Sequence, residues 1–101
     1  MSEVKHTQGP WMLSGRTVYA LNDQGFNRFS AQVQDAHTSA AELDANARLI
    51  AAAPELLEAL EDMFNGWRYI RETHGDLYGV GWDLAEWKAR AAIAKATGET
   101  K

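Results

Sequence analysis

The sequence predicts an α+β fold, in which a short three-stranded antiparallel β-meander at about residues 10–34 precedes three α-helices. Two observations predict this fold. Short β-prone runs separated by turn residues occupy the first third of the chain, and apolar residues then recur every three or four positions. The length of 101 residues suits a single domain, 1–101, with a modest core.

The predicted strands lie in the runs "PWMLS", "RTVYALN" and "FNRFSAQVQ". The turn "NDQG" between the second and third runs ends in Gly25, which can adopt the positive φ that closes a hairpin loop. In the third run Phe29, Ala31 and Val33 alternate with polar residues, so one face of this strand should be buried. A sheet this small needs a helix across its apolar face.

The first two predicted helices meet at a proline. Ser39 followed by Glu42 fits a capping box and predicts a helix at about 40–53. Pro54 cannot continue that helix, but proline suits the first turn of a second helix, predicted at about 54–72. Pro54 is therefore interpreted as a joint. The buried face of the first helix should carry Leu43, Ala47 and Ile50.

The second and third predicted helices are amphipathic. The second has a broad apolar stripe that should pack on a core, formed by Leu56, Leu57, Leu60, Met63, Phe64, Trp67 and Ile70. The glycine-rich stretch "THGDLYGVGW" then interrupts the pattern. Asp83 with Glu86 marks the start of a third helix at about 83–97. Its buried side should carry Leu84, Trp87 and Ala91.

Charge and composition exclude several classes of function. The net charge is −4, and residues 35–64 carry seven acidic residues and one basic residue. This balance disfavours direct binding to nucleic acid, which requires a positive face. The chain has no cysteine and its three histidines lack metal-ligand spacing, so we expect no metal and no cofactor. No signal peptide or membrane span is predicted, and no catalytic constellation is recognised.

Two segments carry a resemblance to a known group. "HTQGPW" at 6–11, the β-rich stretch after it and "ANARLIAAAPELLEAL" at 45–60 together resemble a widespread group of small proteins encoded by tailed bacteriophages and prophages. The resemblance covers about residues 6–60. It implies a phage gene product that acts in the cytoplasm of the host bacterium. It transfers no catalytic residue to this chain.

Small phage accessory proteins often act by binding, and many block host defences. We therefore expect a non-enzymatic protein that inhibits a bacterial defence system, as an anti-CRISPR does, or another host factor by direct protein binding. An acidic surface would compete with nucleic acid for a basic groove on the target, and aromatic residues of the glycine-rich loop would anchor the contact. The expected contact residues are Glu55, Glu58, Glu61, Asp62, Tyr78 and Trp82. A structural interpretation competes with this one, in which the acidic residues form a solvated face that keeps the protein soluble and the two aromatic side chains fold back over the core.

The alternative hypothesis is an oligomeric sponge that sequesters a nucleotide-type immune signal through guanidinium groups. Its expected ligand-binding residues are Asn46, Arg48, Arg68 and Arg71. A structural interpretation competes with it, in which Arg48 pairs with Asp44 one helical turn earlier and Asn46 bonds to a nearby loop. The apolar stripe and four tryptophans exceed what three strands cover, so we expect a homodimer.

Overall fold

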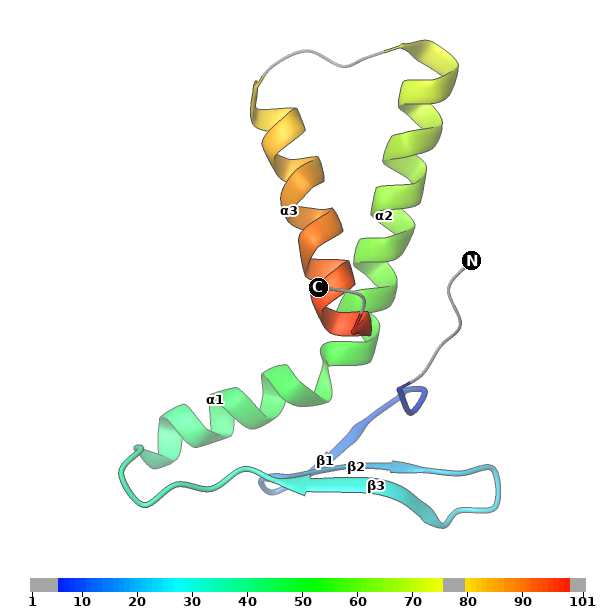
Figure 1. The fold of residues 1–101 in the computed structure, drawn as a ribbon. Coiled ribbons are helices and arrows are strands. Elements are labelled where there is room, and N and C mark those ends of the chain that lie inside the picture. The colour runs from blue at the N-terminus through cyan, green and yellow to red at the C-terminus, as the bar shows by residue number, and fades with distance from the viewer. Residues whose placement is uncertain (1–5, 76–79, 99–101) are drawn as a thin grey trace. The chain divides into compact units, whose positions relative to one another are not determined.

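The computed structural model describes residues 6–75 and 80–98, and for His74 and residues 80–83 it describes the backbone alone. It confirms the predicted α+β fold, with three strands followed by three helices (Figure 1). The chain forms two compact units, Met1–Leu56 and Leu57–Lys101. The single domain expected from the length stays a prediction. The elements are β1 (Met12–Ser14), β2 (Thr17–Leu21), β3 (Asn27–Gln32), α1 (Ala40–Ala51), α2 (Ala53–His74) and α3 (Val80–Thr97).

The first unit holds a small core between the sheet and α1. The strands pair antiparallel in the order β1-β2-β3, and α1 contacts β1 and β2 (Figure 1). Val18 and Ala20 of β2 are fully buried, as is Ala47 of α1, and Leu43 is 7% exposed. Among the residues whose side chains the structure describes, these four are all of the buried apolar ones. Ile50, predicted to join them, is 37% exposed.

Local signals in the first unit are confirmed. Gly25 has φ +88° in the turn between β2 and β3, where the Asn22 carboxamide oxygen accepts the backbone N–H groups of Gln24 and Phe26. The inward residues of β3 are less exposed than their polar neighbours, as the alternation predicts. The Ser39 hydroxyl accepts the Glu42 N–H at 3.2 Å and caps α1.

The helix joint also lies where Pro54 predicts it. α1 ends at Ala51 and is capped by Ala52, whose N–H donates to the Arg48 carbonyl. α2 begins at Ala53, so Pro54 occupies its first turn, where a missing N–H costs nothing. The first helix ends two residues before the predicted boundary because the proline ring disturbs the turn that precedes it.

The two segments that carry the phage resemblance meet in the first unit. Gly9 lies against Pro54, so close that a Cβ atom at Gly9 would be 3.0 Å from Pro54 Cβ and 3.1 Å from Cγ. Trp11 donates its indole N–H to the Thr7 carbonyl, and its ring packs on Phe29 at 4.8 Å between centroids. These contacts give both segments a role in the fold.

The second unit differs from prediction in its boundaries and its burial. α2 runs to His74 rather than 72, and α3 begins at Val80 rather than 83. On α2 the stripe is split: Leu57, Leu60, Phe64 and Trp67 are half-buried, whereas Leu56, Met63 and Ile70 are 53%, 73% and 39% exposed.

The predicted buried side of α3 was wrong. Leu84 and Trp87 are 55% and 66% exposed, and Ala91 is exposed too, whereas Glu86, Ala89 and Ile93 are less so. The less exposed side of α3 thus carries Glu86, whose ion pair with Arg71 shows that this side lies toward α2. No helix in the described part of the chain has the length and apolar character needed to span a membrane.

Candidate protein-binding surface

The acidic residues predicted to bind a partner lie on α2, in both units. Glu55 belongs to the first unit, beside the contact between Gly9 and Pro54. Glu58, Glu61 and Asp62 belong to the second unit. Glu58 and Asp62 are exposed and one helical turn apart, whereas Glu61 is half-buried. In the part of the chain that the structure describes, no ion pair involves any of these four carboxylates.

Folding alone does not account for the carboxylates of Glu58 and Asp62. The helix dipole stabilises acidic residues mainly in the first turn, which contains Glu55 but neither of these two. Like charges four residues apart lower helix stability by about 0.2–0.5 kcal/mol. The pair therefore places uncompensated negative charge on the surface at a small cost in stability.

Tyr69 extends this surface and was not identified as an anchor from the sequence. It lies seven residues after Asp62, which brings it to the same side of α2, and it is 65% exposed. Its position in the sequence could have identified it. Tyr69 falls outside the apolar stripe, and its spacing from Glu58 and Asp62 puts all three residues on one side of the helix. We call these three residues, Glu58, Asp62 and Tyr69, the acidic strip.

The two predicted aromatic anchors cannot be placed on this surface. Tyr78 lies outside the described residues. The backbone of Trp82 belongs to α3 rather than to a loop, since the helix begins at Val80, and its side chain lies outside the description. The predicted role of both residues in binding stays a prediction.

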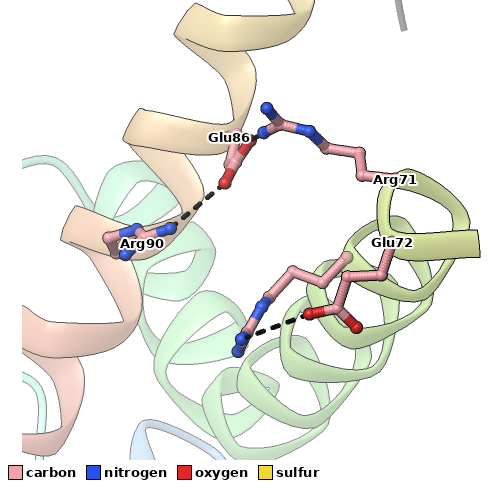
Figure 2. A network of polar contacts seen from close by, with 5 residues as sticks. Arg71, Glu72, Glu86 and Arg90 are labelled. Atoms are coloured by element: carbon pink, nitrogen blue, oxygen red, sulfur yellow. Dashed lines mark hydrogen bonds and ion pairs between the residues drawn. The ribbon is translucent and has the colours of Figure 1, made fainter. Parts of the chain in front are cut away.

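Two arginines of the alternative ligand site, Arg68 and Arg71, have carboxylate partners within the second unit. Glu86 of α3 accepts from Arg71 of α2 and, at 3.1 Å, from Arg90 (Figure 2). Arg68 lies 4.0 Å from Glu72. The guanidinium groups of Arg68 and Arg90 also lie over the Phe64 ring, at 5.9 and 5.5 Å. An anion at Arg71 would therefore compete with Glu86.

The other two residues of that alternative site, Asn46 and Arg48, are exposed on α1 in the first unit. The structural interpretation of Arg48 named the wrong partner for Asp44. The Asp44 carboxylate instead accepts from Arg16 Nε at 2.6 Å, and the described residues include no ion pair between Arg48 and Asp44. Arg16 lies in the turn between β1 and β2, so this bond ties α1 to the sheet.

The histidines whose side chains are described take part in local contacts. His6 Nδ1 lies 2.9 Å from the Thr7 carbonyl oxygen, and its ring meets Trp11 edge-on. The His37 backbone N–H donates to the Asp35 carboxylate at 2.6 Å, which closes a short turn. Among the described residues no cluster of three potential metal ligands occurs.

Comparison with known proteins shows a similarity to a phage protein family. The model of a family described as Salmonella phage P22 protein Y8K6 matches residues 1–100. Neither the search of curated proteins nor the search of solved structures found a match.

Proposed function

Because the chain belongs to the Salmonella phage P22 protein Y8K6 family, we propose that it is a phage accessory protein that inhibits a bacterial defence system or another host factor. It acts in the host cytoplasm, by binding a protein rather than by catalysis. The observation that carries this proposal is the acidic strip, in which two exposed carboxylates have no cationic partner among the described residues and an exposed tyrosine follows them.

Charge supports a basic protein surface as the target. Residues 57–64 contain three acidic residues and no basic one, so this segment carries a net negative charge; the guanidinium groups of Arg68 and Arg90 lie near its last residue, Phe64. Such a segment steers a positively charged groove into contact and raises the association rate, more strongly at low ionic strength. Tyr69 adds contact area at small cost in side-chain entropy. A groove that normally holds a nucleic-acid backbone has the required charge.

A charge reversal within the strip tests the proposal. Asp62→Lys removes one carboxylate and adds a cation four residues after Glu58, which favours the helix. Asp23→Lys, in the exposed turn between β2 and β3, changes the net charge equally and serves as the matched control. Tagged chains of all three kinds would be used to capture proteins from a bacterial lysate at low and high salt.

We expect the parent chain and Asp23→Lys to capture the same basic protein at low salt and to lose it as the salt rises. Asp62→Lys should lose it at every salt concentration while its helix content is unchanged. The same order should appear when phage plating is measured on hosts with active defence systems. Equal capture by Asp62→Lys and the parent chain would show that the acidic strip does not bind the partner.

The alternative, a nucleotide sponge, is distinguished by thermal shift. A ligand that binds only the folded chain raises the melting temperature by mass action. A panel of cyclic nucleotides should leave the melting temperature unchanged if the protein-binding proposal holds. A concentration-dependent rise that Arg71→Gln abolishes would favour the sponge.

A further inference from the structure

Two neighbouring faces of α2 are apolar, and α3 contacts one of them. Phe64 and Arg71 lie on this inner face. Phe64 contacts Arg90 of α3, and Arg71 contacts Glu86 of α3. Leu57, Leu60 and Trp67 lie on the same side by their spacing of three and four, and all three are half-buried. The inner face is therefore turned toward α3.

The other apolar face, which we call the outer seam, has the same helical spacing, and its residues lie one position before those of the inner face. It consists of Ala59, Met63, Gly66, Ile70 and Thr73, at intervals of four, three, four and three. Met63 is 73% exposed and Ile70 39%, and no atom lies within 4 Å of a Cβ placed at Gly66. This interval is the one by which helices pair along a seam.

The order of large and small residues makes the outer seam complementary to itself. Consider two copies of α2 that run antiparallel and are related by a two-fold axis between Phe64 and Asn65. Met63 of each copy then faces Gly66 of the other. Ala59 likewise faces Ile70, so a large side chain meets a small one at both of these levels. A two-fold axis requires this self-complementarity. In a parallel pair, like residues would face each other and the glycines would leave a gap.

Charge along α2 favours the same orientation. Residues 57–64 carry three acidic groups and no basic group, whereas residues 65–74 carry two arginines and one glutamate. Arg71 pairs with Glu86 and Arg68 lies near Glu72, so the main effect of an antiparallel pair is to keep the two acidic halves apart. A parallel pair would set the two acidic halves side by side, which costs free energy.

We infer that the outer seam of α2 binds a second copy of this chain, in an antiparallel pair with Met63 against Gly66 at its centre. The seam from Ala59 to Thr73 is about 22 Å long at 1.5 Å per residue. A contact along so short a seam buries little surface area compared with most specific protein interfaces, so the dimer dissociates on dilution. The acidic strip remains at the edge of each helix.

The first test measures mass against concentration by sedimentation equilibrium, with two matched variants. Met63→Glu places a carboxylate at the centre of the seam. Asn65→Glu adds the same charge to the same helix on another face. Both substitutions put a good helix former into α2. We expect the parent chain and Asn65→Glu to dimerise and Met63→Glu to weaken dimerisation at least tenfold, with helix content unchanged by circular dichroism.

The second test fixes the orientation and uses the absence of cysteine from the chain. Ala59→Cys and Ile70→Cys chains are prepared separately and mixed in a glutathione redox buffer. In the antiparallel pair the two introduced thiols face each other, but two copies of either variant keep theirs about 16 Å apart along the axis, beyond disulfide reach. Cross-linking should therefore appear only in the mixture.

Three results would overturn the inference. One is a chain that stays monomeric at every concentration. Another is equal dimerisation of the parent chain and Met63→Glu, which would place the interface elsewhere. The third is efficient cross-linking of Ala59→Cys alone, which would show a parallel pair.

Discussion

Replacement of Gly9 by alanine tests whether the two phage-like segments hold the first unit together. The new Cβ would lie 3.0 and 3.1 Å from two carbons of the Pro54 ring and 3.2 Å from a Glu55 carboxylate oxygen. A proline ring cannot rotate away, so the backbone must shift, at a cost of about 1–3 kcal/mol for overpacking. Alanine restricts the unfolded chain and returns about 0.4–1 kcal/mol. We expect a net loss of about 1–2 kcal/mol.

The assay is urea unfolding followed by far-ultraviolet circular dichroism at a protein concentration at which the chain is monomeric, with Gly66→Ala as the matched substitution. Gly66 lies in the interior of α2 with open space at its Cβ position, so alanine there should raise stability by about 0.5–1 kcal/mol. The same chemical change should therefore shift the midpoint in opposite directions at the two sites. A midpoint for Gly9→Ala at or above that of the parent chain would refute the packing argument.

Three further substitutions probe the first unit in the same assay. Val18→Ala, at a fully buried position, should cost about 1–3 kcal/mol by removing two methyl groups from the core, and a smaller loss would mean that the core collapses around the gap. Ser39→Ala should cost about 1 kcal/mol because the Glu42 N–H loses its acceptor; Ser39→Asp should restore it. Asp44→Asn should cost under about 1 kcal/mol, since both partners are partly exposed, and high salt should reduce the difference.

Features set by neighbouring residues could be predicted from the sequence. The Ser39 cap, the turn at Gly25 and the joint at Pro54 each depend on residues within about four positions, and all three are confirmed. The partner of Asp44 could not be predicted, because Arg16 is 28 residues away. The i,i+4 spacing on a helix identifies Arg48, which is near in sequence, as the partner. Asp44 instead makes a tertiary contact with Arg16, next to the sheet.

Burial on α2 and α3 shows a second limit. Helical periodicity assigns residues to the faces of a helix. It does not say which other element packs on a face or how many residues of that face the element buries. The stripe from Leu56 to Ile70 is wide enough for two contacts, and α3 takes the inner one alone. On α3 the less exposed side carries Glu86, whose partner Arg71 lies 15 residues earlier on another helix, and the apolar pattern of Leu84 and Trp87 did not indicate this contact.

The distribution of partners along the chain separates fold from function. Gly9, Trp11 and Pro54 each pack on another part of the first unit, so the phage-like segments are explained by the contacts they make there. Beyond Leu56, α2 differs. In the described part of the chain the carboxylates of Glu58, Glu61 and Asp62 have no cationic partner, and Met63 and Ile70 of the outer seam are exposed. Stability would be served by replacing Asp62 or Gly66, since one repels Glu58 and the other weakens the helix. Residues that lower the stability of a helix while complementing an outside surface are the ones expected where binding, rather than folding, determines the sequence.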